Sequence, residues 1–304
     1  MVLDRVDILL STYNGEAYIK DQLDSIFDQS YKNIRVVVRD DGSCDRTLEI
    51  VKEYDVEILE AYENLGAKMS FAALLEYALN SSNSKYFMFA DQDDVWSSDK
   101  VQKSIDRIKE FEKENTKSMP LLIHSNLRVV DENLKIMDSS FWHYSQIDPA
   151  KNSFNRLLLQ NTVTGCTMLI NRELAYLALP IAPEAIMHDW WIALVAAKFG
   201  KIVALKESTM DYRQHSSNDT GAKGFTLGYI VQKALSSEPI SKYQHQAKAF
   251  LEHYQAKLDS STQEMLLAFS KIEQYSRIQK IVLLFKYGFF KQGAIRNLGL
   301  MLKV

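Results

Sequence analysis

The first hundred residues alternate short apolar runs with amphipathic segments, and this alternation constrains the fold more than any other feature of the chain. The runs that we expect to be strands are residues 6–10, 34–38, 56–61 and 86–90. The segments with helical spacing are residues 19–29, 46–54, 70–79 and 98–111. Strands that alternate with helices in this way form a parallel sheet with helices on both faces. The sequence therefore predicts an α/β fold with a mostly parallel, Rossmann-like sheet.

The pattern becomes less regular after residue 120. Short strands are expected at residues 121–125, 127–130, 167–170, 202–205 and 208–212. Among them we expect a mobile loop over residues 138–152 and a helix over residues 189–199 that ends at Gly200. From residue 226 onward only helical patterns remain. We therefore divide the chain into an α/β domain, residues 1–224, and a helical C-terminal region, residues 225–304.

The charges are nearly balanced overall but unevenly placed. The chain has 36 Lys+Arg and 39 Asp+Glu, a net charge of -3, which gives no case for general nucleic-acid binding. Residues 225–304 hold 11 of the Lys+Arg and only 5 of the Asp+Glu, so a basic tail follows an acidic body. Such asymmetry indicates that the tail meets a partner or a surface.

Cysteine use and the start of the chain predict a cytoplasmic protein. The two cysteines, Cys44 and Cys166, lie far apart and do not suggest a disulfide scaffold. Acidic residues stand near the N-terminus, where a signal peptide needs an apolar core. No stretch approaches the roughly 18 uncharged apolar residues of a spanning helix. We therefore expect a location in the cytoplasm, which includes the inner face of the cell membrane.

An acidic cluster, residues 91–94, directly follows the fourth apolar run. Carboxylates at the end of a buried strand are costly unless a cation lies among them. In open α/β sheets, ligands bind at the carboxyl ends of the strands. Oxygen ligands suit Mg²⁺ or Mn²⁺ together with the phosphates of a substrate. The cluster therefore predicts a metal that holds a diphosphate, and the alternative is a solvated acidic turn after an edge strand.

The other three strand ends also carry polar, turn-forming residues. They are residues 11–16, residues 39–47, which include Asp40-Asp41-Gly42-Ser43, and residues 64–66. Taken alone, the second of these is better explained as a turn at Gly42 followed by a helix cap at Asp45. Four polar strand ends in succession instead predict one ligand site along the edge of the sheet.

Together these motifs resemble the family 2 glycosyltransferases, which have a GT-A fold. The resemblance extends beyond residue 96 through Thr164-Gly165-Cys166, Met187-His188-Asp189-Trp190-Trp191 and Tyr212-Arg213-Gln214-His215. The Asp-Gln-Asp-Asp, His-Asp-Trp and Tyr-Arg-Gln-His forms are most similar to bacterial rhamnosyltransferases, which use dTDP-L-rhamnose. Many members of the family carry Glu-Asp where this chain has His188-Asp189, which affects contacts with the acceptor rather than the base itself.

The resemblance implies a role for each of these residues. The nucleotide-sugar donor would contact Thr12, Tyr13, Asn14, Asp40, Asn64, Gly66, Lys68 and Asp91. In particular, Asp40 would accept a hydrogen bond from the pyrimidine ring, and Tyr13 would cover the base or ribose. Asp93 and His215 would ligate Mn²⁺ or Mg²⁺. Without the other motifs, His215 would be better explained as a histidine of a surface loop.

The acceptor side centres on Asp189. By the resemblance, Asp189 would be the catalytic base, and its position at the start of a predicted helix favours the ionised carboxylate. The alternative is a simple helix-capping aspartate. His188, Trp190 and Trp191 would lie toward the acceptor, with one of the two tryptophans in the core.

The resemblance thus implies an inverting glycosyltransferase that moves L-rhamnose from dTDP-L-rhamnose onto a surface polysaccharide, with a free or lipid-linked saccharide as acceptor. One alternative is a UDP-hexose transferase. A second is a sugar-nucleotide nucleotidyltransferase, but residues 13–16 lack the Gly-rich basic loop usual in that class. A third is a carbohydrate-binding protein without activity, and retention of Asp93, Asp189 and His215 together argues against it.

The end of the tail is both apolar and basic. Over residues 278–291, apolar side chains are interrupted by Lys280, Lys286 and Lys291. Helices of this kind lie at membrane surfaces. They also dock on their own domain or on a second copy of the chain. The sequence leaves peripheral membrane contact and homodimerisation as alternatives for the C-terminal helices.

Overall fold

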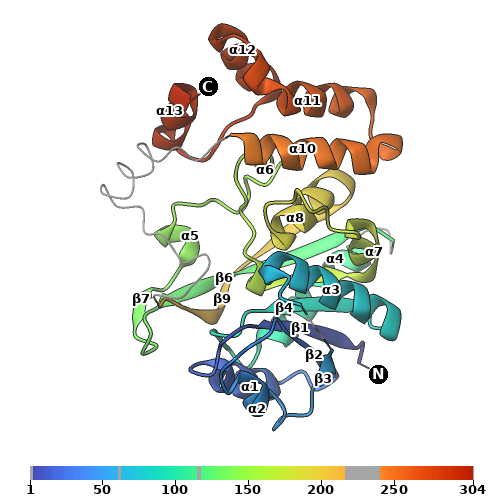
Figure 1. Ribbon diagram of the computed structural model, residues 1–304, viewed down its shortest axis with the longest axis vertical. Coiled ribbons are helices and arrows are strands. Elements are labelled where there is room, and N and C mark those ends of the chain that lie inside the picture. Colours follow the sequence, from blue (N-terminus) through green and yellow to red (C-terminus); the bar gives the residue numbers. More distant parts are fainter. Residues whose placement is uncertain (1–2, 61–62, 115–117, 216–239, 304) are drawn as a thin grey trace.

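The computed structural model describes residues 3–60, 63–114, 118–215 and 240–303, and it contains one nine-stranded sheet with helices on both faces (Figure 1). The strands are β1 (Val6–Thr12), β2 (Ile34–Asp40), β3 (Glu57–Leu59), β4 (Tyr86–Ala90), β5 (Val95–Trp96), β6 (Leu121–Val130), β7 (Ile136–Asp138), β8 (Met168–Asn171) and β9 (Lys201–Arg213). Their order is β3-β2-β1-β4-β8-β6-β9-β5, and β7 pairs with β6.

The helices follow the strands closely in the first half of the chain and dominate its end. Those of the first half are α1 (Ile19–Phe27), α2 (Thr47–Val51), α3 (Gly66–Ser81) and α4 (Lys100–Glu114). Those of the middle are α5 (Phe141–Tyr144), α6 (Phe154–Leu157), α7 (Arg172–Ala178) and α8 (His188–Phe199). The C-terminal region contains α10 (Ser241–Tyr254), α11 (Ser260–Ser270), α12 (Arg277–Tyr287) and α13 (Ala294–Lys303).

The first four strands form the predicted parallel unit. β1 pairs in parallel with both β2 and β4, and β2 pairs in parallel with β3. Alternate side chains of β1 enter two different cores because successive residues of a strand point to opposite faces. Leu9 lies in the core that contains α3 and α8, whereas Ile8 and Leu10 lie in the core that contains α1 and α4. The α/β expectation is confirmed.

The second half of the sheet is mixed rather than parallel. β8 inserts antiparallel between β4 and β6, and β5 pairs antiparallel with β9. Each pair of short strands predicted here is one long strand, β6 or β9, and these two run parallel with shifts of register near Asn126. Such irregularities bend a strand locally, which explains why the sequence pattern breaks at these points.

The segment predicted to be a mobile loop, residues 138–152, is instead held in place. It contains α5, and its backbone is bonded to the C-terminal region. Arg296 donates to the carbonyl oxygens of Ser145 (2.6 Å) and Gln146 (2.9 Å). The Gln292 side chain accepts from the backbone N–H of Asp148 (2.6 Å) and donates to its carbonyl (2.9 Å). These partners are distant in sequence, so no local pattern reveals them.

The C-terminal helices share a core with the α/β sheet. Phe250 of α10 packs against Trp191 of α8, with ring centroids 5.5 Å apart, and α10 lies alongside α8 in Figure 1. The Tyr254 hydroxyl donates to the carbonyl of Leu177 at 2.7 Å. The predicted boundary at residues 224 and 225 lies outside the described residues. Within the described ranges, no helix has both the length and the apolar character needed to cross a membrane.

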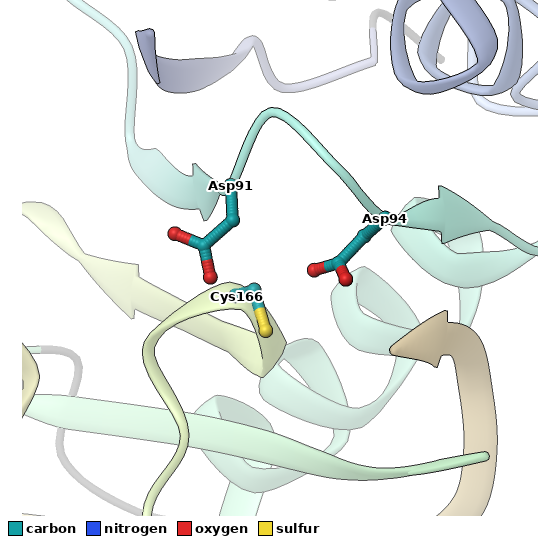
Figure 2. A group of neighbouring side chains, drawn as sticks. All are labelled: Asp91, Asp94 and Cys166. Atoms are coloured by element: carbon teal, nitrogen blue, oxygen red, sulfur yellow. The ribbon is translucent and has the colours of Figure 1, made fainter. Parts of the chain in front are cut away.

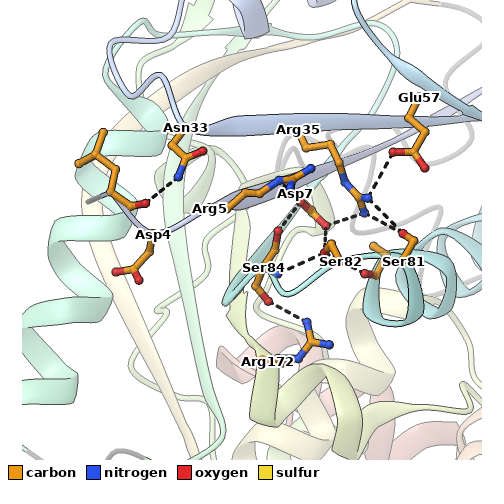
Figure 3. Close-up of polar contacts among 12 residues, drawn as sticks. Asp4, Arg5, Asp7, Asn33, Arg35, Glu57, Ser81, Ser82, Ser84 and Arg172 are labelled. Atoms are coloured by element: carbon orange, nitrogen blue, oxygen red, sulfur yellow. Dashed lines mark hydrogen bonds and ion pairs between the residues drawn. The ribbon is translucent and has the colours of Figure 1, made fainter. Parts of the chain in front are cut away.

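A buried carboxylate at the start of β1 has a structural role. Asp7 is fully buried and accepts hydrogen bonds from Ser84 (2.6 Å), Ser82 (2.7 Å) and Arg35 (2.8 Å) (Figure 3). Arg172 extends the network by donating to the Ser84 carbonyl at 2.9 Å. The network lies at the end of β1 opposite the predicted site, and both oxygens of Asp7 have partners. It joins β1, β2 and the segment between α3 and β4.

We expect Asp7→Ala to destabilise the protein by about 1–3 kcal/mol, because the Ser82 and Ser84 hydroxyls lose their buried acceptor, while Arg35 keeps Glu57 at 3.2 Å as a second partner. The midpoint of urea unfolding, measured by circular dichroism, should fall accordingly. Asp55→Ala is the matched control, since Asp55 is exposed, and its effect should stay within about 0.5 kcal/mol. An unchanged midpoint for Asp7→Ala would show that this network adds no stability.

Candidate active site

The carboxyl ends of β1, β2 and β4 lie side by side. Thr12 is in register with Asp40, and Leu10 is in register with Ala90. The polar segments that follow these strands therefore meet at one edge of the sheet, as predicted. The Thr12 hydroxyl donates directly to Asp40 at 2.8 Å, which joins the ends of the first two strands.

Asp40 organises the loop that follows β2. One of its oxygens accepts from the hydroxyls of Thr12 (2.8 Å) and Ser43 (2.5 Å), and the other accepts from the N–H groups of Gly42 (3.2 Å) and Ser43 (2.8 Å). A carboxylate offers about four acceptor positions, and all of them are taken here. A nucleotide base that bonded to Asp40, as the resemblance implies, would have to displace one of these donors.

Tyr13 is held by its backbone and leaves its ring accessible. The Gln92 side chain accepts from the Tyr13 N–H (2.8 Å) and donates to the Tyr13 carbonyl (2.9 Å), and the Tyr13 side chain is 50% exposed. Asn14 has a positive φ of 47° and accepts from the backbone N–H of Cys44 at 2.8 Å. A Cβ on Gly15 would lie 2.3 Å from Gln92, so Gly15 is needed for this approach. Gln92 was not predicted as a site residue, and only its position in the acidic cluster marks it.

The segment after β3 is shaped by Asp41. The Gly66 N–H donates to Asp41 at 2.7 Å and to the Asn64 side chain at 3.1 Å, and Gly66 has a φ of +70°, which favours glycine. Lys68 points away from this loop. Its ammonium donates to the carbonyls of Pro183 and Ala185, in the segment before α8. The structure therefore gives Lys68 a connecting role rather than a free charge for the donor.

Asp93 and His215 lie in contact although they are distant in sequence. The His215 Nε2 is 2.8 Å from an Asp93 carboxylate oxygen. The His215 ring stacks on Tyr18, with centroids 4.6 Å apart. Arg213 fixes the same corner by donating to the Asp93 carbonyl at 3.0 Å and to Asp21 at 2.7 Å. The structure thus brings together the two residues expected to bind a metal.

A second acidic group lies beside this pair. The group consists of Asp91, Asp94 and Cys166, each of which offers one ligand atom. These three atoms lie within 4.8 Å of one another, and the carboxylates point toward Cys166 in Figure 2. Asp94 is fully buried, and its Oδ2 has no hydrogen-bond partner among the described residues. Burial and the neighbouring carboxylates of Asp93 and Asp91 raise the pKa of Asp94 well above its usual range. Asp94 was missed in the sequence, although it belongs to the same acidic run.

This chemistry fits a hard divalent cation. Clustered carboxylates and one imidazole are suitable ligands for Mn²⁺ or Mg²⁺, and a cation would favour the ionised form of Asp94. The Cys166 thiol does not fit such an ion, because burial and the nearby Asp94 raise its pKa well above its usual range. The residues that would hold a metal are therefore the carboxylates and His215.

A short turn, Gly165–Thr167, connects the acidic group with Asp189. Cys166 faces Asp91 and Asp94, while the preceding Gly165 lies against α8: a Cβ there would be 3.4 Å from that of Asp189. Lys100 holds the turn by donating to the Cys166 carbonyl at 2.9 Å. Lys100 is itself buried, and burial lowers its pKa to about 8. The turn therefore lies between the predicted base and the acidic group of Asp91 and Asp94.

Asp189 is half-buried in the first turn of α8. Burial raises its pKa to about 7, although hydrogen bonds from the backbones of Trp190 and Gly165 and from the Asn161 side chain oppose this rise. The expectation that the helix start keeps Asp189 readily ionised is therefore wrong, because burial outweighs the helix dipole. A carboxylate with a pKa near neutrality is well matched to accept a proton in catalysis.

The neighbours of Asp189 pack inward. Trp191 is fully buried against α10 and donates to the Ala178 carbonyl at 3.0 Å, so it is the tryptophan of the pair that was expected in the core, and it has no surface for an acceptor. His188 was expected toward the acceptor, but its ring is buried 4.2 Å from that of Phe71, and burial lowers its pKa to about 3. Trp190 is half-buried and donates to the Leu157 carbonyl at 2.5 Å. Of the three, only Trp190 keeps an accessible surface.

This sheet, its polar strand ends and its helical C-terminal region define a GT-A glycosyltransferase. The family described as "Glycosyl transferase family 2" matches residues 7–175, which is more than half of the chain. The protein belongs to glycosyltransferase family 2.

Two curated relatives are named as glycosyltransferases. A dTDP-rhamnosyl transferase, RfbG, from Shigella flexneri is 28% identical over 229 residues, which cover 70% of this chain and 74% of that protein. A putative teichuronic acid biosynthesis glycosyltransferase, TuaG, from Bacillus subtilis is 29% identical over 174 residues, which cover 55% of this chain and 62% of that protein.

Solved structures support the fold. TarS 1-349 from S. aureus, in complex with UDP-GlcNAc, aligns with a TM-score of 0.60 at 17% identity and covers 93% of this chain and 80% of that one. A mannosyltransferase from Pyrobaculum calidifontis, in complex with GDP-Man and Mn²⁺, aligns with a TM-score of 0.53 at 15% identity and covers 98% of this chain and 79% of that one. At these identities, the comparison establishes the fold alone.

Proposed function

We propose that this protein is an inverting, metal-dependent glycosyltransferase that moves L-rhamnose from dTDP-L-rhamnose to a saccharide acceptor of a surface polysaccharide. The observation that carries this proposal is the turn Gly165–Thr167, which separates the Asp91–Asp94 cluster on one side from Asp189 on the other. A site with a charged donor end and a single carboxylate base across from it suits sugar transfer with inversion. The name of the Shigella relative supports the choice of donor.

Asp189 would act on the acceptor. Its carboxylate takes the proton of the acceptor hydroxyl while the hydroxyl oxygen bonds to the anomeric carbon. The bond from that carbon to the diphosphate breaks on the opposite face, so the configuration inverts. With its pKa raised to about 7, Asp189 holds the transferred proton better than an ordinary aspartate does.

The donor would bind at the strand ends. Tyr13, with its exposed ring, covers the base or ribose, and Asp91 contacts the ribose or the water shell of the metal. Mn²⁺ or Mg²⁺, held by Asp93 and His215, would supply the charge that stabilises the departing diphosphate. Because the loop after β2 already uses all acceptor positions of Asp40, we assign Asp40 to shaping the base pocket.

A lipid-linked saccharide at the inner face of the cell membrane is the acceptor that we favour. The Bacillus relative is named as a putative glycosyltransferase of teichuronic acid biosynthesis, which supports a role in polysaccharide biosynthesis. The half-buried Trp190, beside Asp189, offers an aromatic surface for the sugar.

A thermal-shift panel tests the donor. We expect dTDP-L-rhamnose with Mn²⁺ to raise the melting temperature more than UDP-glucose, UDP-galactose or UDP-GlcNAc, since a ligand at 100 times its Kd adds about 2.7 kcal/mol of stability. The same samples without Mn²⁺ show whether binding needs the metal. Stronger stabilisation by a UDP-sugar would favour the UDP-hexose transferase instead.

Two further outcomes separate the remaining classes. Release of pyrophosphate from dTTP and a sugar 1-phosphate would identify a nucleotidyltransferase. Binding of oligosaccharide without turnover of any nucleotide sugar would identify a carbohydrate-binding protein.

A further inference from the structure

The last two helices expose apolar side chains in helical register. On α12, Ile278, Val282 and Phe285 follow one another at the spacing that places residues on one face. On α13, Ile295, Leu298 and Leu302 do the same. Their side chains range from 49% exposed at Ile295 to 76% exposed at Ile278. We call these six residues the C-terminal apolar face.

The two helices are nevertheless firmly placed. Leu284 of α12 and Leu300 of α13 are buried in the core that also contains α8 and α10. α12 begins with a capping box formed by Ser276 and Gln279 and ends at Gly288, which has a φ of +65°. One side of each helix therefore binds the protein, while the opposite side presents large apolar groups to solvent. Large apolar side chains that are exposed along one side of a helix mark an interaction site.

The charged side chains of the segment that contains α12 and α13 have a single sign. Residues 274–304 contain six Lys and Arg and no Asp or Glu. Lys286 is paired with Glu264 of α11 at 3.0 Å, but Arg277 and Lys280 form no ion pair within the described part of the chain. α12 and α13 lie at the end of the molecule away from β1, β2 and β3 (Figure 1). This end of the molecule is therefore both basic and apolar. The rest of the chain up to residue 224 is acidic, with 25 Lys+Arg and 34 Asp+Glu.

We infer that the C-terminal apolar face docks on an anionic lipid bilayer. The apolar side chains enter the interface between headgroups and acyl chains, and Arg277 and Lys280 meet the lipid phosphates. The acidic body is repelled by the same surface, so the charge asymmetry also orients the molecule with its C-terminal helices toward the lipid.

Charge favours lipid over a second copy of the chain. In a symmetric dimer the same patch meets itself, which would bring two basic faces together. Nucleic acid would match the positive charge but would leave the six apolar side chains in water. An anionic bilayer satisfies both parts of the surface at once. The inference does not depend on which sugar the protein transfers.

Co-sedimentation of the full chain with vesicles tests this inference. We expect binding to vesicles of phosphatidylcholine mixed with phosphatidylglycerol, little binding to phosphatidylcholine alone, and weaker binding at high salt. The triple variant Ile278→Ser, Val282→Ser and Phe285→Ser should bind at least about tenfold more weakly because it loses most apolar contacts of α12. The double variant Arg277→Gln and Lys280→Gln should lose part of the preference for phosphatidylglycerol.

The matched control is Ile136→Ser with Met137→Ser, on β7. Both side chains are more than half exposed but lie outside the C-terminal region, so this variant should bind vesicles as the wild type does. Equal vesicle binding by the wild type and the α12 triple variant would overturn the inference. So would a wild-type dimer that ignores vesicles and becomes monomeric, by light scattering, in the triple variant.

Nucleotide binding is scored separately in the same samples. All variants should keep the wild-type melting temperature and its shift with dTDP and Mn²⁺. A wild type that binds vesicles but no dTDP would count against the proposed function and leave the lipid surface intact. A wild-type protein that binds dTDP but no vesicles would overturn the lipid inference and leave the proposed function intact.

Discussion

Asp189→Asn is expected to lower sugar transfer by about 10²- to 10⁴-fold while leaving binding of the donor nucleotide unchanged, because it removes the base and keeps the shape of the side chain. Initial rates of transfer, and melting temperatures with and without dTDP, measure the two properties separately. Glu184→Gln is the control: Glu184 is the nearest carboxylate upstream and is exposed before α8, so its loss should leave the rate unchanged. Transfer by Asp189→Asn at a near wild-type rate would place the base elsewhere.

The same residue predicts how activity and stability change with pH. A base must be ionised, so the transfer rate should rise with pH and level off above about 7. Stability should change in the opposite direction. Because burial raises the pKa of Asp189 above its ordinary 3.8, the folded state favours the protonated form, and stability from this group is lost between these two pKa values as pH rises. The melting temperature of Asp189→Asn should therefore exceed that of the wild type at about pH 8 and equal it at about pH 4.

Asp93→Ala should weaken metal-dependent nucleotide binding by at least about 10- to 100-fold, the range that follows from losing even an outer-shell partner of a metal. His215→Ala should weaken it less, since it removes a neutral ligand rather than a charge. Titration of Mn²⁺ against dTDP binding measures both effects.

A matched pair elsewhere provides the control for this prediction. His143 and Asp138 form a similar contact at 2.9 Å, but His143 is exposed and stands in α5. His143→Ala should leave the Mn²⁺ titration unchanged. If the Asp93 and His215 variants also titrate like wild type, neither residue binds the metal, and the neighbouring carboxylates of Asp91 and Asp94 are the remaining candidate ligands.

Local sequence pattern was sufficient for the first half of the fold. The alternation of Ile8, Leu9 and Leu10 between two cores requires helices on both faces, and that requirement is visible in the sequence. The antiparallel insertion of β8 was not visible, because strand direction depends on pairing with β4 and β6 rather than on the residues of β8. Residues 138–152 were predicted to be mobile for the same reason: Arg296, which holds their backbone, is distant in sequence.

The candidate site shows a similar limit. The sequence identified Asp93 and His215, and the structure places them in contact. It could not show that Lys68 binds backbone carbonyls or that α10 covers Trp191, since these partners are not encoded by any motif. The pKa of Asp189 was misjudged because burial, which depends on the whole fold, outweighs the local helix dipole.

The contact between Gly15 and Gln92 has a consequence for how such a chain changes over evolutionary time. A Cβ at position 15 would meet the amide end of the Gln92 side chain, so a larger residue there requires this amide to move. The same amide holds both backbone groups of Tyr13, and moving it would release them. A substitution at position 15 therefore disturbs Tyr13 through Gln92, without touching Tyr13 itself. The tolerance of position 15 is thus expected to depend on the residue at position 92, across the loops that follow β1 and β4.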